Sequence, residues 1–95
     1  MTIATCYSVY ILLSKKDEKL YVGCTSNLKA RIERHNSGYV PATKHRRPLL
    51  VVHTENFKDR SDAFNRERFL KSLYGAREKK NILKRYLAKS VRSAN

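Results

Sequence analysis

The sequence predicts one small α/β domain of the α+β type, built from three strands and three helices. β-forming residues alternate with a period of two near the N-terminus, and a continuous apolar run near the middle is also typical of a strand. Three other stretches show apolar residues at helical spacing, and glycines end the first two. With 95 residues, of which 41% are hydrophobic, the chain is expected to enclose a single core without an internal boundary.

The first element predicted is a β-hairpin. Large apolar residues occupy both sets of alternating positions from Cys6 to Leu13, so this strand is expected to be buried on both faces. The wholly polar run 14–19 connects it to a second strand, from Leu20 to Cys24, in which Gly23 is expected to let the chain turn toward a helix. The two strands are therefore expected to be antiparallel.

A helix that carries an arginine follows the hairpin. Three good N-cap residues precede an apolar pattern at helical spacing, and Gly38 can supply a left-handed C-cap, so a helix is predicted from about Asn27 to Asn36. Arg31 borders the inward face of this helix. Its side chain either snorkels along the helix edge or places a guanidinium in a cleft, where its planar fork suits phosphate oxygens.

The middle of the chain and its C-terminal segment differ in pattern. The segment from Tyr39 to Pro48 shows no periodicity and predicts a basic loop, whereas the apolar run from Leu49 to Thr54 predicts an interior strand. The segment from Ala76 onward has an apolar face at helical spacing and many basic residues. A basic helix is expected there from about 76 to 89.

Glu67 is difficult to explain by local structure. Ser61 or Asp62 can cap a helix that Gly75 ends. One face of that helix is predicted to hold Ala63, Glu67, Leu70 and Tyr74. A carboxylate on an otherwise apolar face needs a metal or an arginine as a compensating cation, unless the helix is rotated by one position and Glu67 lies on the surface.

The charge of the chain points to a polyanionic partner. Its 21 basic residues exceed its 8 acidic residues by 13. So large an excess favours nucleic acid through counterion release, although a soluble protein with many lysines would show the same composition. The candidate phosphate-binding residues are Lys44, Arg46, Arg47, Lys71, Lys79, Lys80, Lys84 and Arg85.

The two cysteines predict free thiols. Cys6 and Cys24 do not form a close Cys-x-x-Cys pair, and no cluster with metal-ligand spacing surrounds them. Residues 1–5 show no signal-peptide pattern, and no apolar run approaches membrane-spanning length. The expected compartment is the cytoplasm, with no membrane partner and no small-molecule cofactor, while the oligomeric state is left open.

Three further side chains are candidates for chemistry. Tyr10 and Tyr21 lie on the two hairpin strands, and their hydroxyl groups can converge on one side of it. Tyrosines in strands usually serve packing, and a phenol with a pKa of about 10 is a poor base at neutral pH without a nearby cation. His35 can relay a proton or form an inner hydrogen bond.

Taken together, these residues resemble a known nuclease family. The triplets Ser8-Val9-Tyr10 and Tyr21-Val22-Gly23, followed by Arg31, His35-Asn36 and Glu67, are similar in order and spacing to the GIY-YIG nuclease superfamily. Serine replaces the glycine of the first triplet, and valine replaces the isoleucine of the second. The resemblance covers residues 7–73 and is greatest to the stand-alone bacterial members, and it extends to the incision domain of the bacterial nucleotide-excision repair nuclease.

The resemblance implies a fold, a reaction and a role for each residue. The implied fold is a three-stranded antiparallel sheet flanked by helices, and the implied reaction is hydrolysis of DNA phosphodiesters with one divalent metal, Mg²⁺ or Mn²⁺. In this resemblance Glu67 would hold the metal, Arg31 would stabilise the pentacovalent phosphorus and Tyr10 would help activate water. Tyr21 and His35 would assist by hydrogen bonding or proton transfer.

Three functions are consistent with these observations. The leading one is a metal-dependent DNA endonuclease that acts on branched, damaged or single-stranded structures in repair. The second is a nucleic-acid-binding module that keeps the nuclease fold without turnover, as the charge of +13 also suggests. The third is an adaptor whose basic C-terminal helix docks on an acidic protein.

Overall fold

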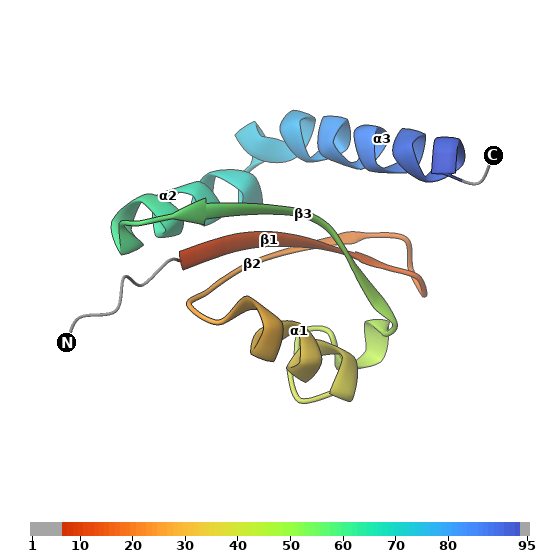
Figure 1. The fold of residues 1–95 in the computed structure, drawn as a ribbon, viewed down its shortest axis with the longest axis horizontal. Helices are drawn as coiled ribbons and strands as arrows, with labels where there is room; N and C mark the ends of the chain where they lie inside the picture. The colour runs from red at the N-terminus through yellow and green to blue at the C-terminus, as the bar shows by residue number, and fades with distance from the viewer. Residues whose placement is uncertain (1–6, 94–95) are drawn as a thin grey trace.

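Three antiparallel strands form the middle layer of the structure, a computed structural model that describes residues 7–93 (Figure 1). The strands, in the spatial order β2-β1-β3, are β1 (Tyr7–Ser14), β2 (Leu20–Thr25) and β3 (Leu49–Phe57). The helices are α1 (Leu28–Ser37), α2 (Arg60–Lys71) and α3 (Ala76–Ser93), with short 3₁₀ turns η1 (Lys44–Arg46) and η2 (Leu73–Gly75). In Figure 1, α1 and η1 lie on one side of the sheet and α2 and α3 on the other. The predicted fold class is thus confirmed.

The central strand β1 separates two hydrophobic clusters. Val9 and Ile11 pack with residues of α2 and α3 on one face, and Tyr10 and Leu12 pack with residues of α1 on the other. Each fully buried side chain of this size contributes about 1.5–3 kcal/mol to folding. The antiparallel hairpin and the burial of its first strand on both faces are therefore confirmed; Cys6, where that strand was predicted to begin, lies outside the described residues.

The prediction of an interior strand from Leu49 to Thr54 is wrong in its position. This segment belongs to β3, which extends to Phe57 and, among residues 7–93, pairs only with β1, so it is an edge strand of the described sheet. Leu50 and Val51 remain 38% and 36% exposed. A continuous apolar run is typical of interior strands, but here the hairpin connection of β1 to β2 leaves β3 the outer place beside β1.

Helix α1 has the capping groups that its sequence predicts. The side-chain oxygen of Asn27 accepts a hydrogen bond from the backbone N–H of Ala30 at 3.1 Å. Gly38 ends the helix in the left-handed conformation, with φ of 86°. Two residues earlier, the amide of Asn36 exchanges two hydrogen bonds with the backbone of Leu49, at 2.9 and 3.1 Å. This side chain attaches the end of α1 to the start of β3.

Helix α2 differs from its prediction at both ends. Its N-cap is Asp59, which accepts the N–H of Ser61 at 2.8 Å, so neither Ser61 nor Asp62 is the cap. The helix ends at Lys71, and Tyr74 lies in η2 with 86% of its surface exposed rather than on the buried face. Gly75 follows, where an added Cβ would lie 2.3 Å from the carbonyl oxygen of Phe69. The chain therefore turns tightly against the end of α2 before α3 begins.

A charged network attaches both helices on this face to β3. The Arg66 guanidinium of α2 donates hydrogen bonds to Glu55 of β3, at 2.8 and 2.9 Å, and to Glu78 of α3. These bonds hold the pKa of both carboxyl groups below the ordinary range. Ile82 of α3 is buried and packs in the same hydrophobic cluster as Val9 and Ile11. Within residues 7–93, no helix is long and apolar enough to cross a membrane.

Candidate active site

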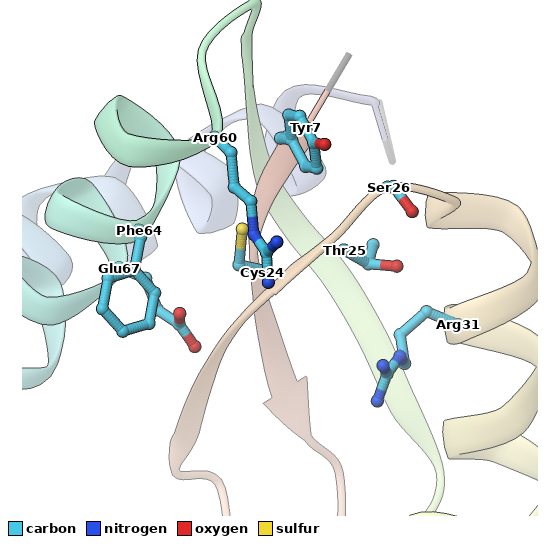
Figure 2. Close-up of a pocket in the computed structure, with 8 residues that line it drawn as sticks. All are labelled: Tyr7, Cys24, Thr25, Ser26, Arg31, Arg60, Phe64 and Glu67. Atoms are coloured by element: carbon cyan, nitrogen blue, oxygen red, sulfur yellow. The ribbon is translucent and has the colours of Figure 1, made fainter. Parts of the chain in front are cut away.

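An open cleft of about 490 Å³ lies where the end of β2 passes between α1 and α2. Figure 2 shows side chains entering it from both helices, with β2 between them. The residues that line the cleft are Tyr7, Cys24, Thr25, Ser26, Arg31, Arg60, Phe64 and Glu67. It combines positively charged, hydroxyl, aromatic and carboxylate groups in one place.

Arg31 and Glu67, both predicted from sequence, enter this cleft from opposite sides. Arg31 comes from α1 and Glu67 from α2, and in Figure 2 their charged ends extend toward the space between the helices. Glu67 is only 14% exposed, and its Oε2 atom lies 2.8 Å from the Nζ atom of Lys71 one turn later. The protein cation paired with Glu67 is therefore Lys71 and not an arginine.

Arg60 is a cleft residue that the sequence reasoning missed. It is the first residue of α2 and lines the cleft together with Arg31. Neither guanidinium has a hydrogen-bond or ion-pair partner among residues 7–93, whereas the Arg66 guanidinium bonds to two carboxylates, those of Glu55 and Glu78. The spacing of Arg60, Phe64 and Glu67 at i, i+4 and i+7 marks one helix face and is the signal that could have found it.

A second group of candidate residues lies buried against β1. We call Tyr10, Tyr21, His35 and Thr43 the inner cluster. The Tyr10 hydroxyl is 2.8 Å from Nε2 of His35, and Nδ1 of His35 is 2.7 Å from the Thr43 hydroxyl. The Tyr21 ring meets the His35 ring edge-on, with centroids 5.2 Å apart. Both nitrogens of a fully buried histidine are thus satisfied, and Thr43 is a member that sequence reasoning did not identify.

Burial changes the acid–base character of the inner cluster. It raises the pKa of Tyr10 well above the ordinary value of 10.0, and the neighbouring Tyr21 raises it further. It lowers the pKa of His35 below 6.5, and the positive charge of Arg31 lowers it further. At neutral pH the cluster therefore holds a neutral phenol and a neutral imidazole. The charges of Arg31 and Glu67 also act on Tyr10, so the inner cluster adjoins the cleft although none of its members lines it.

Gly23 has a different role from the one predicted. It lies inside β2, which continues to Thr25, and it pairs with Tyr10 of β1, so the chain does not turn at this glycine. An added Cβ would lie 2.3 Å from two atoms of the Tyr10 ring end. The glycine is required because the tyrosine side chain crosses directly over its backbone.

The predicted phosphate-binding residues do not gather into one surface. Lys44, Arg46 and Arg47 lie beside α1, whereas those of α3 lie beyond the opposite face of the sheet (Figure 1). Arg46 is paired with Asp17 at 2.8 Å, and Lys71 is paired with Glu67. Lys44, Arg47, Lys80, Lys84 and Arg85 are exposed, and Lys79 is half-buried.

The cleft offers one carboxylate to a metal. Within residues 7–93, no group of three or more histidine, cysteine, aspartate and glutamate residues is close enough to enclose a metal ion. Mg²⁺ commonly binds through one or two carboxylates together with water and substrate phosphates. Glu67, which faces an open cleft, fits this kind of site and not a closed protein cage. The Cys24 thiol beside it is free, and burial raises its pKa, so it is protonated at neutral pH.

Comparison with known proteins gives consistent results. The model of the GIY-YIG catalytic domain family matches residues 6–81. A UPF0213 protein of Natronomonas pharaonis is 39% identical over 81 residues, covering 84% of this chain and 94% of the relative. One of Staphylococcus haemolyticus is 40% identical over 78 residues, covering 80% and 95%. The solution NMR structure of a UPF0213 protein from Bacillus halodurans matches with a TM-score of 0.53 and 31% identity, covering 81% of this chain and 82% of that one.

Proposed function

The chain belongs to the GIY-YIG family, and from this premise we propose that it is a metal-dependent endonuclease that hydrolyses DNA phosphodiester bonds. The observation that carries the proposal is the placement of Arg31 and Glu67 on opposite sides of one open cleft. The two residues come from different helices, 36 positions apart (67 − 31). An unpaired guanidinium facing a carboxylate suits a ligand that carries both a phosphate and a cation.

Arg31 is the group that would contact the scissile phosphate. Its planar fork of N–H donors matches phosphate oxygens, and it stabilises the negative charge that develops on them in the transition state. Because no residue in the described range 7–93 pairs with its side chain, no internal ion pair must be broken when a phosphate binds.

Glu67 is the residue that would hold the divalent metal, Mg²⁺ or Mn²⁺. A bound cation would polarise the phosphoryl group and favour ionisation of a nearby water molecule. Glu67 must then exchange its ion pair with Lys71 for the metal, which leaves the Lys71 ammonium group able to contact a phosphate. Separation of this one pair would let Glu67 act as a metal ligand and Lys71 as a phosphate ligand.

The inner cluster would move a proton away from the attacking water. The Tyr10 hydroxyl can donate to a neutral Nε2 of His35, and its oxygen, which lies against Gly23 and does not line the cleft, would accept a second hydrogen bond only from a water molecule that enters beside Gly23. Burial lowers the pKa of His35 and so keeps that imidazole unprotonated and able to accept. Tyr21, whose ring contacts His35, would hold the imidazole in place.

We further propose that the enzyme recognises DNA structure rather than sequence and acts in DNA repair. Sequence is read by side chains that enter the grooves, whereas exposed lysines and arginines contact the backbone of any DNA. The candidate phosphate ligands lie on two separate sides of the molecule, in the loop 44–47 and on α3. Such contacts suit a branched or unpaired substrate whose arms diverge.

Cleavage of labelled flap, junction and single-stranded DNA with Mg²⁺ or Mn²⁺ tests this function. Arg31→Ala and Glu67→Ala are each expected to slow cleavage by about 10²–10³-fold, the usual effect of removing one electrostatic group from such a site. Chelation of the metal should have a similar effect. If either variant cuts as fast as the parent, that residue has no catalytic role; if the parent cuts none of the substrates, the nuclease proposal fails.

A second candidate is a nucleic-acid-binding module without turnover, which the charge of +13 favours. It predicts tight binding that needs no metal and weakens steeply as salt is raised. Binding measured with a chelator present separates the two functions when cleavage is absent. A dissociation constant that does not change with salt would contradict this alternative.

A further inference from the structure

One helix face brings an aromatic ring beside the charged groups of the cleft. Arg60, Phe64 and Glu67 project from the same side of α2, and Figure 2 shows the Phe64 ring beside Glu67 and the Arg60 guanidinium extending over Cys24. Phe64 is 54% exposed. The Arg68 guanidinium lies 5.9 Å from the centroid of its ring. This exposed ring is therefore at the cleft and not on an unrelated surface.

The aromatic ring and the two guanidinium groups together indicate what kind of ligand fits the cleft. A flat apolar ring binds a flat apolar partner, and two unpaired guanidinium groups, of Arg31 and Arg60, bind two anionic groups. A strand of DNA carries both features in alternation, a base and a phosphate. In a duplex, however, the base faces are covered by neighbouring bases, so only an unpaired base can stack on a protein ring beside its own backbone.

Taking the cleft as a DNA site, as the proposed function does, we propose that Phe64 and Arg60 form a subsite for one unpaired nucleotide next to the scissile phosphate. Phe64 stacks on the base, and Arg60 binds the adjacent phosphate. Arg31 and Glu67 act on the phosphate that is cut, on the other side of the cleft. The substrate class then follows from Phe64, because the subsite favours single strands, flaps and frayed ends over continuous duplex.

Binding experiments without metal test the subsite separately from catalysis. Three fluorescent DNA probes are compared with a chelator present: a single strand, the same strand with stable abasic analogues in its centre, and a blunt duplex. The variants are Phe64→Ala, Phe64→Trp and Arg60→Ala. Tyr74→Ala and Arg34→Ala are the controls, since they remove an exposed aromatic ring and an exposed arginine outside the cleft. Thermal melting confirms that each variant is folded.

The parent protein is expected to bind the complete single strand about 5- to 100-fold more tightly than the abasic strand, because each stacked base contributes this much. Phe64→Ala should remove the difference, and Phe64→Trp should keep it. Arg60→Ala should weaken binding of both strands. It should also lower the slope of log Kd against the logarithm of the salt concentration by about one. Neither control should alter these values.

Two results would overturn the subsite. One is a Phe64→Ala variant that discriminates against the abasic strand as well as the parent does, and the other is an Arg60→Ala variant that behaves like Arg34→Ala. Metal-dependent cleavage is then measured separately on the same probes. If Phe64→Ala no longer discriminates against the abasic strand but the parent cuts none of the probes, the subsite is supported and the nuclease proposal fails. If Phe64→Ala cuts single strands with the same preference over duplex as the parent, the subsite alone is overturned.

Discussion

The inner cluster and the cleft differ in what surrounds their functional groups. His35 is fully buried, and both of its ring nitrogens have partners inside the protein. In the cleft, the Arg31 and Arg60 side chains face open space and have no partner among residues 7–93. The five candidate catalytic residues thus divide into Tyr10 and His35, which are fully buried, Tyr21, which is half-buried against them, and Arg31 and Glu67, which line the cleft and are available to a ligand.

This difference suggests that the two regions contribute to function in different ways. A side chain that is hydrogen-bonded in the core contributes to folding stability and holds its neighbours in place. A charged side chain in an open cleft contributes little to stability and keeps its binding energy for the substrate. Changes in the cleft should therefore affect activity alone, and changes in the inner cluster should affect stability first.

The largest effect is expected from Arg31 in the cleft. Arg31→Ala should lower the cleavage rate by about 10²–10³-fold while the free energy of unfolding changes by less than about 0.5 kcal/mol. The measurement pairs cleavage kinetics with denaturant unfolding. Arg34→Ala, one turn away on α1 and outside the cleft, is the matched control and should change neither quantity. A large loss of stability in Arg31→Ala would remove the contrast between the two regions.

The next effect is expected from Gly23 beneath the inner cluster. Gly23→Ala places a methyl group where the Tyr10 ring lies, so the free energy of unfolding should fall by about 1–3 kcal/mol, the usual cost of overpacking a core. Chemical denaturation measures this loss. In a Tyr10→Leu background the same glycine substitution should cost much less, because the end of the ring is absent. Additive losses in the double variant would exclude the clash as the cause.

A smaller effect is expected from removing one hydroxyl group of the inner cluster. Tyr10→Phe leaves Nε2 of His35 buried without a partner and should lower the free energy of unfolding by about 1–2 kcal/mol. Tyr21→Phe, at a half-buried ring that contacts His35 by its edge, should cost less than about 0.5 kcal/mol. Equal losses in the two variants would contradict the importance of the Tyr10–His35 hydrogen bond.

The smallest effect is a dependence of stability on pH. Because burial lowers the pKa of His35 from 6.5 in the folded state, the unfolded chain takes up a proton first, and stability should decrease as pH falls below 6.5. The slope cannot exceed about 1.4 kcal/mol per pH unit for one proton. Carboxylates such as Glu55, whose pKa is lowered from 4.5 by Arg66, lose their contribution only at lower pH. His35→Gln should flatten the curve between about pH 6.5 and 5.

Elements fixed by neighbours in sequence were predictable. The hairpin follows from alternation along the chain, and α1 follows from its own caps, Asn27 and Gly38. Arg31 and Glu67 were identified as candidates because a charge beside an apolar face is visible in a helical pattern. That Arg31 and Glu67 line one cleft was implied only by the resemblance to the family, since no local sequence pattern relates residues so far apart.

Features that depend on distant contacts were not predictable. The edge position of β3 depends on which strand takes the centre, and the end of α2 depends on the tight packing of Gly75 against Phe69. Thr43 becomes a partner of His35 only when the loop after α1 folds back. Arg60 was overlooked because an exposed arginine at a helix start has no distinctive pattern until β2 is placed beside it.

The basic loop 44–47 is held by several bonds before any ligand arrives. Thr43 bonds to His35, the Arg46 guanidinium bonds to Asp17 and lowers the pKa of that carboxyl to about 2, and the Arg46 carbonyl accepts a bond from Ser14. The conformational entropy of this loop is thus lost on folding, and binding of DNA does not have to supply it. Lys44 and Arg47, which we propose as phosphate ligands, therefore lie on a loop that is already ordered, and their free energy of binding would go into affinity rather than into ordering the loop.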